Sequence, residues 1–357
     1  MSDPTAPTTG TDPTKTLLSE SSLNDKDLCD YVVNVATGCR HGCKFCYVPA
    51  TPNIRARPEM LSEKAGVENP QGEWGEYVLY RDGLGERLAD HLDRKRTWRE
   101  TTGGQGIVGV SFSTDCYMDG RAGKITRNVV EALTSRGLYT RILTRNPILA
   151  LQDQDVIVDA EEYVTIGSSI PTLDAELSQA IEPSAPAPQQ RLRGLQKWND
   201  LGVTTFVSMS PTYPTHTKAD LREVLEAIQT VDPDVVFHEP INPRAGNFDL
   251  TVQAAADAGL ETLASELKQL EDRSQWVEYA VDHFRAVQSL AAELDIDVHL
   301  WPDDQLLSYL DDGNTQEWLA TWKARQSPED FADRPSPDTE PPALPTSPHR
   351  STSLTEF

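Results

Sequence analysis

The sequence lacks both a long apolar run and a secretory start. Within its 357 residues, no apolar stretch is long enough to cross a bilayer. The first residues, MSDPTAPTTGTDPTK, contain neither the basic nor the apolar segment of a signal peptide. We therefore expect a cytoplasmic protein that has no membrane partner.

Cysteine is scarce, and its distribution argues against a disulfide framework. The chain has five cysteines, an odd number, and three of them lie between positions 39 and 46. Crowded cysteines without obvious pairing are typical of a metal or redox site in a reducing compartment. The segment that matters most is therefore 38–49, GCRHGCKFCYVP.

Basic residues are few in relation to acidic ones. The 56 acidic and 32 basic residues give a formal net charge of −24, which argues against a broad basic face for nucleic acid. The acidic residues are, however, spread along the whole chain, as on the solvated surfaces of proteins that work in high salt. Because high salt screens charge attraction for any partner, the net charge decides little about function.

Composition divides the chain into four predicted regions. Residues 1–25 and 327–357 are rich in Thr, Pro, Ser and Asp, and they are predicted to be disordered tails. Residues 26–250 are predicted to form the core. Residues 251–326 are predicted to extend the core with helices and a last strand at 297–301.

Strand and helix patterns alternate through the predicted core. Six short apolar runs, rich in β-branched residues, predict buried strands at 30–36, 106–112, 139–144, 163–169, 204–210 and 234–240. Helical periodicity is clearest at 84–96, 124–137, 189–202 and 219–231. The alternation predicts an α/β fold, a partial (β/α)6 barrel with a parallel sheet and right-handed crossovers. Chemistry is expected at the carboxyl ends of its strands.

Three interpretations are open for the pattern C-x3-C-x2-C of Cys39, Cys43 and Cys46, which follows the first predicted strand. A zinc site needs a fourth ligand, and His41 is near, but no second half of a zinc motif is visible. A redox disulfide needs only two cysteines. A four-iron cluster uses all three thiolates and leaves one iron open for a substrate or cofactor. We favour this third interpretation.

At these residues the chain resembles the radical S-adenosylmethionine (SAM) superfamily, with Phe45 as the aromatic residue before the last cysteine. The resemblance implies a [4Fe–4S] cluster bound by Cys39, Cys43 and Cys46, with SAM bound at the open iron. It also implies reductive cleavage of SAM to a 5′-deoxyadenosyl radical that abstracts hydrogen. The implied partner is a reductase or a ferredoxin-type electron donor.

Further segments are similar to the spore photoproduct lyase-like branch, also called DNA repair photolyase-like. The similarity covers about residues 30–245 and includes SFSTDCYM (111–118), LTRNP (143–147), SSIPTLDAELSQAIEPSAPAPQQRLRGL (168–195), SPTYP (210–214) and EPINPR (239–244). It implies a lyase-like enzyme, with nucleic acid as the leading substrate class by analogy.

The resemblance also implies cofactor contacts at the strand ends. Phe45 would lie beside the adenine, and Arg145 would stand in for a lysine near the cofactor carboxylate. Ser168 or Ser169 would bind the carboxylate or the ribose. The cofactor amine would be read by the end of the second strand, at Ser113, Thr114 and Asp115. A hydroxyl residue at a strand end has an alternative role as the cap of the following helix.

One departure from the branch concerns the hydrogen donor. Spore photoproduct lyase keeps its donor cysteine three residues before the position of Asp115, where this chain has Phe112. Cys116 takes the place of the branch's usual proline and is the candidate catalytic residue that donates hydrogen. The alternative is a small buried thiol without a catalytic role.

Basic and aromatic residues give weaker signals. Arg55, Arg57 and the segment 94–99, RKRTWR, would contact phosphates, with Trp98 stacking on a base. Their alternative is a solvated surface. At the sixth strand end, three residues would line a substrate pocket or bond one another: Glu239, Asn242 and Arg244.

Three functions are consistent with the sequence. The first is a radical SAM enzyme that acts on nucleic acid. The second is radical modification of a peptide, a tRNA or a small metabolite by the same core. The third is a non-catalytic scaffold stabilised by zinc or by an iron–sulfur cluster. The sequence does not determine the oligomeric state.

Overall fold

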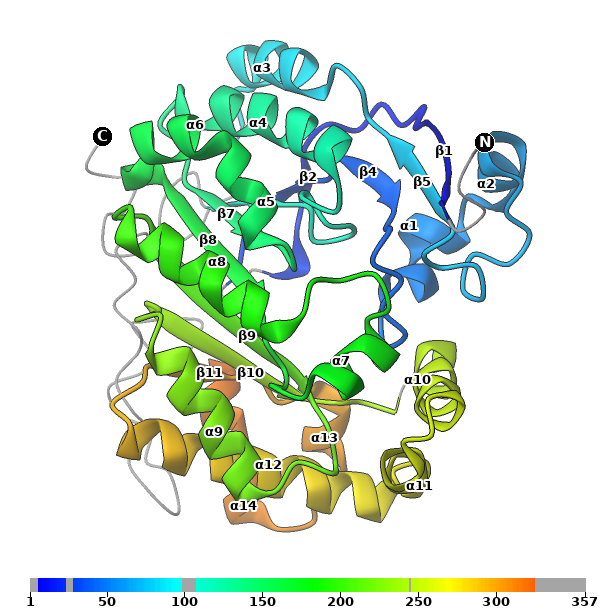
Figure 1. Cartoon of the computed structure of the whole chain (residues 1–357), viewed down its shortest axis with the longest axis vertical. Helices are drawn as coiled ribbons and strands as arrows, with labels where there is room; N and C mark the ends of the chain where they lie inside the picture. Colours follow the sequence, from blue (N-terminus) through cyan, green and yellow to red (C-terminus); the bar gives the residue numbers. More distant parts are fainter. Residues whose placement is uncertain (1–5, 24–27, 98–106, 244, 325–357) are drawn as a thin grey trace.

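The computed structural model describes residues 6–23, 28–97, 107–243 and 245–324 (Figure 1). The strands are β1 (Thr8–Thr11), β2 (Ser19–Glu20), β3 (Tyr31–Val33), β4 (Ala36–Gly38), β5 (Tyr77–Tyr80), β6 (Val108–Val110), β7 (Thr140–Leu143), β8 (Val164–Ser169), β9 (Thr204–Thr212), β10 (Val235–Pro240) and β11 (Val298–Leu300). The helices of the first half are α1 (Pro52–Arg55), α2 (Pro58–Ala65), α3 (Leu84–Arg94), α4 (Gly120–Thr134), α5 (Pro147–Ala150), α6 (Gln154–Asp159) and α7 (Ala175–Ile181). The later helices are α8 (Pro188–Asp200), α9 (Lys218–Gln229), α10 (Ala245–Asp257), α11 (Glu261–Gln269), α12 (Arg273–Glu293), α13 (Asp304–Tyr309) and α14 (Gly313–Ala324).

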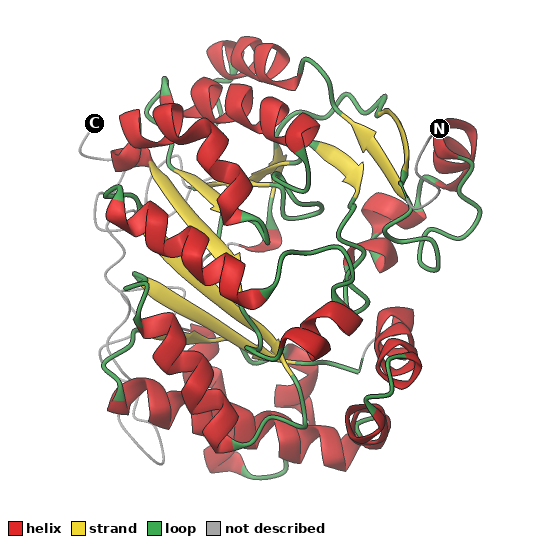
Figure 2. Ribbon diagram, in the orientation of Figure 1, coloured by secondary structure: helices red, strands yellow, loops and turns green. Residues whose placement is uncertain are grey.

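The main sheet contains the six predicted strands as parallel neighbours. Its order is β11-β10-β9-β8-β7-β6-β3-β2, and the short β2 pairs antiparallel with β3 at one edge. Helix α8 packs on β8 and β9, and α12 packs on β10 and β11; Figures 1 and 2 show α8 lying over the strands. Because consecutive parallel strands alternate with covering helices, the predicted partial barrel is confirmed.

A second, smaller sheet was not expected from the sequence. The predicted strand at 30–36 divides into β3, in the main sheet, and β4, which pairs antiparallel with β5. The chain changes sheets at Asn34, whose side chain accepts a hydrogen bond from the Ser113 N–H at 2.9 Å. Strand β5 escaped prediction because its apolar and aromatic run, YVLY, has only four residues, at the lower limit for a strand and shorter than the runs that were predicted.

The N-cap residue of helix α4 determines where this helix begins. Periodicity placed this helix at 124–137, but it begins at Gly120, because the Asp119 carboxylate accepts hydrogen bonds from the N–H groups of Arg121 and Ala122. Beyond its end, Gly137 has φ +67, as expected for the residue that terminates a helix.

The segment after residue 250 adds helices and β11, as predicted. Strand β11 pairs with β10 in parallel, so the extension lengthens the main sheet by one strand. Helix α12 also packs on α9, and α14 packs on β11. The predicted C-terminal tail, 327–357, lies outside the described residues.

The prediction of a disordered tail at 1–25 is wrong for residues 6–23. Strand β1 pairs in parallel with β5, and Asp12, which is 4% exposed, anchors the segment that follows. The Asp12 carboxylate accepts hydrogen bonds from Thr37 Oγ1 at 2.7 Å and from Arg81 Nε at 3.0 Å. Composition missed this because partners distant in the sequence, not local apolar residues, order the segment.

We expect Asp12→Ala to lower the free energy of unfolding by about 2 kcal/mol, because it leaves Arg81 buried without its carboxylate partner. Urea unfolding followed by circular dichroism measures the change. Asp93→Ala, which removes the exposed partner of Arg136, is the control and should leave the midpoint unchanged. An unchanged midpoint in the Asp12 variant would contradict a stabilising role for the N-terminal segment.

A buried cluster of histidines joins α12 to the sheet. The hydroxyl group of Thr212 lies 3.1 Å from His238 Nε2 and 3.2 Å from His283 Nδ1. Because a hydroxyl group both donates and accepts, it can bond one nitrogen of each neutral ring. Burial lowers the pKa of His216 from 6.5 to about 4 and that of His283 to about 3, and it lowers the pKa of His238 well below its usual value.

Because of these buried histidines, we expect the free energy of unfolding to fall as the pH is lowered. Above pH 6.5 the rings are neutral in both states, so they add no pH dependence. Between pH 6.5 and about 4 the unfolded chain binds protons that the folded chain does not, so the free energy of unfolding falls. Urea midpoints measured at several pH values test this, and His283→Gln should flatten the slope. A slope identical in the variant would contradict it.

Candidate functional site

The three clustered cysteines lie on one loop that begins at the end of β4. Cys39 is 8% exposed and Cys43 is 6% exposed, while Cys46 is half-buried. The loop depends on glycine at its start, where Gly38 has φ +88 and a Cβ atom would lie 2.3 Å from the Tyr77 carbonyl oxygen. The sequence therefore determines both the soft donor atoms and the tight backbone that carries them.

Burial keeps the three thiols protonated in the metal-free protein. It raises the pKa of Cys39 to about 12, that of Cys43 well above its usual value, and also that of Cys46. The Arg145 guanidinium opposes this rise at each of the three sulfurs. Since thiolate is the form that binds metal, loading this loop with iron would release protons.

The turn after α7 holds the cysteine loop from one side. The Lys44 N–H donates to the Ile181 carbonyl at 2.9 Å, and the Ser184 N–H donates to the His41 carbonyl at 3.3 Å. Helix α10 holds it as well, because Asn247 Nδ2 donates to the Phe45 carbonyl at 2.9 Å. Figure 1 shows this end of β4 leading toward α7 and α10. The loop is thus clamped by elements far from it in the sequence.

Asp115 ties the cysteine loop to the end of β7. Its carboxylate accepts hydrogen bonds from Thr144 Oγ1 and the Arg145 N–H, both at 2.7 Å, and lies 3.2 Å from His41 Nε2. Burial raises the pKa of Asp115, but His41 and these hydrogen bonds outweigh burial and lower it to about 2. Both carboxylate oxygens already bond protein groups, so the structure places this side chain in the wall of the site.

A buried ion cluster lies next to Cys43. Glu182, 1% exposed, accepts a hydrogen bond from Arg145 Nε and lies 2.6 Å from Arg191 Nη2. Burial raises the pKa of Glu182, but the two guanidinium groups lower it to about 2. Arg145 also lies over the Phe45 ring, 5.3 Å from its centroid. The structure therefore brings together two predicted cofactor contacts and adds Glu182, to which the sequence assigned no role.

The side chains of the other predicted cofactor contacts point in different directions. Thr114 Oγ1 donates to the Gly38 carbonyl, which joins the end of β6 to the start of the cysteine loop. Ser169 pairs with Ser208, and Ser168 pairs with the core residue Val207. Adjacent residues of a strand face opposite sides, so Ser168 faces the helices and Ser169 faces the inside of the barrel. Ser113 is half-buried at the same strand end as Thr114.

Cys116 and Phe112 lie in two separate apolar clusters. Cys116 is fully buried, its sulfur lies 3.9 Å from the Leu143 carbonyl oxygen, and burial raises its pKa well above the usual value. The half-buried ring of Phe112 packs against the small apolar cluster that contains Cys29. Both environments are apolar, and the structure leaves the predicted donor role of Cys116 untested.

Tyr47 directly follows the last cysteine of the motif, and the sequence assigned it no role. It is 56% exposed. Its position after Cys46 and its high exposure are the signals that identify it as a residue able to touch a substrate.

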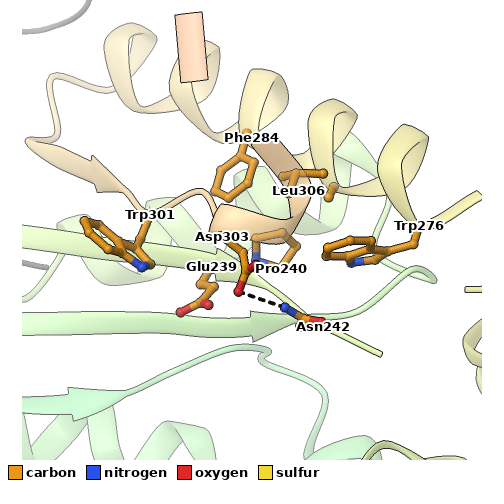
Figure 3. A pocket seen from close by; sticks show the side chains of 9 residues that line it. Glu239, Pro240, Asn242, Trp276, Phe284, Trp301, Asp303 and Leu306 are labelled. Carbon is orange, nitrogen blue, oxygen red and sulfur yellow. Dashed lines mark hydrogen bonds between the residues drawn. The ribbon is translucent and has the colours of Figure 1, made fainter. Parts of the chain in front are cut away.

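A small cavity lies at the carboxyl end of β10, under the C-terminal extension (Figure 3). Its cavity volume is about 10 Å³, enough for about one water molecule and far below the range typical of ligand pockets. Glu239 and Asn242 line it, and Asn242 Nδ2 donates to Asp303 Oδ2 at 3.1 Å, so a substrate pocket formed by these residues stays a prediction. Figure 3 shows Trp301 with Glu239 at one end and Trp276 at the other. This size suits ordered water better than a substrate.

The two arginines predicted to contact phosphates lie in different surroundings. Arg57 donates to Thr14 Oγ1 at 2.6 Å and to Thr37 Oγ1 at 3.0 Å, so it holds the N-terminal segment instead of facing solvent. Arg55 is exposed at the end of α1. Trp98 and Arg244 lie outside the described residues.

Membrane-spanning helices and preformed metal sites are both absent from the described part of the chain. None of the helices described there is long and apolar enough to cross a membrane. The same residues contain no group of three His, Cys, Asp or Glu side chains arranged to hold a metal ion.

Comparison with known proteins identifies the family. The Radical SAM superfamily profile matches residues 33–228, more than half of the chain. The chain therefore belongs to the radical SAM superfamily, and it is an enzyme of radical SAM chemistry. Its cofactors are those of the family, a [4Fe–4S] cluster and SAM, and the thiols of Cys39, Cys43 and Cys46, which lie on one loop, have the soft donor chemistry that such a cluster takes.

Several similar proteins are described only as uncharacterised. The chain is 29% identical to the uncharacterised protein ORF301 of Acidianus two-tailed virus, over 66% of this chain and 76% of that protein. It is 25% identical to an uncharacterised protein of Methanocaldococcus jannaschii, over 58% of this chain and 68% of the other. It is 28% identical to an uncharacterised protein of Mycobacterium tuberculosis, over 52% of this chain and half of the other.

Two solved structures are similar to the chain at low identity. A spore photoproduct lyase mutant with bound AdoMet and dinucleoside spore photoproduct is 14% identical, with a TM-score of 0.47 over 69% of this chain and 65% of that one. SuiB of Streptococcus suis, bound to S-adenosylmethionine, is 11% identical, with a TM-score of 0.48 over 80% of this chain and 54% of that one. The chain thus spans less than two thirds of these structures, and the branch assignment stays a prediction.

Proposed function

We propose that Cys39, Cys43 and Cys46 hold the [4Fe–4S] cluster and leave one iron for SAM. When bound, these cofactors supply a 5′-deoxyadenosyl radical, formed by reductive cleavage of SAM, that abstracts hydrogen from a substrate. The observation that carries the assignment is the set of three thiols on one clamped loop beside the Arg145 guanidinium. Reduction by a ferredoxin-type protein or a reductase completes the proposal.

The chain's own residues would bind and orient SAM. Arg145, at the end of β7, would attract the cofactor carboxylate, and the Phe45 ring beneath it would pack on the adenine. Ser169, on the inner side of β8, would bond the carboxylate or the ribose. Ser113 would meet the amine, while Thr114 and Asp115 support the loop from below. The resemblance in sequence motifs supports these roles.

We propose nucleic acid as the substrate class. The spore photoproduct lyase-like motifs support it, and so does Tyr47, an exposed ring next to the last cysteine that could stack on a base. Peptide, tRNA and small metabolites are the alternatives for the same core. A lyase-like reaction is the leading expectation from the motifs.

Anaerobic purification tests the assignment directly. We expect about four irons and four sulfides per chain, together with formation of 5′-deoxyadenosine from SAM under a strong reductant. Stoichiometric zinc without iron would favour the scaffold alternative and overturn the proposal. Comparing the rate of 5′-deoxyadenosine formation with DNA, RNA and metabolite pools would then identify the substrate class.

Cys116 is proposed as the catalytic hydrogen donor, and Cys116→Ala tests this role. A donor thiol acts after the radical forms, so we expect the variant to lose product while it still cleaves SAM. The measurement is the ratio of product to 5′-deoxyadenosine. A ratio equal to that of the unmodified protein would assign the buried thiol to core packing alone.

A further inference from the structure

The buried ion cluster beside the cysteine loop contains three charges on three different elements. Glu182 follows α7, Arg145 follows β7, and Arg191 lies within α8. Glu182 and Arg191 are nearly inaccessible to solvent, and the Arg145 side chain is 19% exposed. Two guanidinium groups and one carboxylate leave this cluster with one net positive charge.

The buried ion cluster of Glu182, Arg145 and Arg191 is in direct contact with the cysteine loop. Glu182 Oε1, the oxygen that accepts the hydrogen bond from Arg145, lies 3.8 Å from Cys43 Sγ. Because water is excluded from this region, each charge acts on the sulfur with little screening. A charge at this distance therefore contributes to the potential at anything the sulfur binds.

Glu182 also determines where the Arg145 guanidinium lies. Arg145 is long and flexible, and its side chain bonds the Glu182 carboxylate and lies over the Phe45 ring. Arg191 fixes Glu182 in turn, because it also donates to the Ser169 carbonyl at 3.0 Å and to the Pro186 carbonyl at 2.7 Å. The carboxylate is thus anchored to the sheet and directs Arg145 toward the cysteine loop.

We propose that Glu182 is a positioning residue that holds Arg145 beside Cys43, and that this charged pair sets the reduction potential of the iron–sulfur cluster. The inference rests on the proposed binding of that cluster by Cys39, Cys43 and Cys46. Net charge near an iron–sulfur cluster is one of the factors that determine its potential, since reduction adds an electron. Neutralising either partner should therefore move the potential, and in opposite directions.

The test is a potentiometric titration of the SAM-free, cluster-loaded protein with dithionite, followed by electron paramagnetic resonance. Glu182→Gln removes a negative charge but keeps a side-chain oxygen that can accept the hydrogen bond from Arg145, so we expect Arg145 to stay in place and the midpoint potential to be more positive than that of the unmodified protein. Arg145→Gln removes a positive charge, so we expect a more negative midpoint. Asp155→Asn, which neutralises the exposed partner of Arg127, is the control and should not move the midpoint.

The outcomes separate this inference from the proposed function. Shifts of the same sign in both variants, or no shift, would overturn the electrostatic role even if both variants were less stable. If the Glu182 variant does not fold, the partly exposed Arg145 variant still decides the question. A protein that never loads iron would instead contradict the proposed function.

Discussion

Cys43→Ala should abolish cluster binding and SAM cleavage together. Cys43 is buried on the clamped loop and is one of three proposed ligands. With only two thiolates left on the loop, two irons would lack a protein ligand, so iron content should fall from about four to below one per chain. Formation of 5′-deoxyadenosine should fall at least about 100-fold. Iron analysis, the absorbance of the reconstituted protein and a SAM cleavage assay measure these losses.

The control for this prediction is Cys29→Ala. Cys29 is equally buried but lies in a separate apolar cluster, against Val32 and Ile107, away from the loop. This variant should retain both iron and SAM cleavage. Full iron content in the Cys43 variant would contradict the ligand assignment, and iron loss in both variants would point to general destabilisation.

Asp115→Asn should lower the free energy of unfolding by about 3 kcal/mol. The carboxylate accepts hydrogen bonds from Thr144 and the Arg145 N–H and lies against His41. The amide group of Asn carries no negative charge. Its NH2 group would face the hydrogen-bond donors of Thr144 and Arg145, which need an acceptor. Urea unfolding of the protein under argon measures the loss. Iron content should fall too, because His41 belongs to the cysteine loop.

The loss of unfolding free energy caused by Asp115→Asn should become smaller as the pH is lowered. The pKa of Asp115 is lowered to about 2 from an ordinary value of 3.8, so its stabilising contribution is complete above about pH 4. It is lost as the pH falls toward 2, so the unmodified protein and the variant should converge there. A difference that stays constant from pH 5 to pH 2.5 would contradict the role of the charge. Asp155→Asn, at the exposed partner of Arg127, should show no comparable loss.

The sheet and its helices could be predicted because their signals are local. Each parallel strand, such as β8 or β10, is a short run of buried residues with a helical pattern after it. The same reasoning missed β1 and β5. Strand β1 is mostly exposed and polar, and it forms only because β5 provides its hydrogen-bonding partner. Composition alone therefore predicted disorder where pairing produces order.

The site shows the same division between local and distant information. Eight consecutive positions, 39–46, specify the donor atoms, so an iron–sulfur site could be predicted from their spacing and residue types. Asp115 was predicted as a cofactor contact, but its partners are His41 and the end of β7, which lie far from it in the sequence. Strand ends meet only in the folded barrel, so spacing alone could not reveal that pairing.

The sequence by itself determined the chemistry, because three thiols and the glycine at the start of their loop, Gly38, lie within one short segment. Only the tertiary structure decided which charges surround that loop. The bond between Arg145 and Glu182 spans 37 positions, and that between Arg81 and Asp12 spans 69. Charged pairs of this kind leave no periodic pattern in a sequence, since any acidic residue is an equally good partner until folding excludes water and selects one.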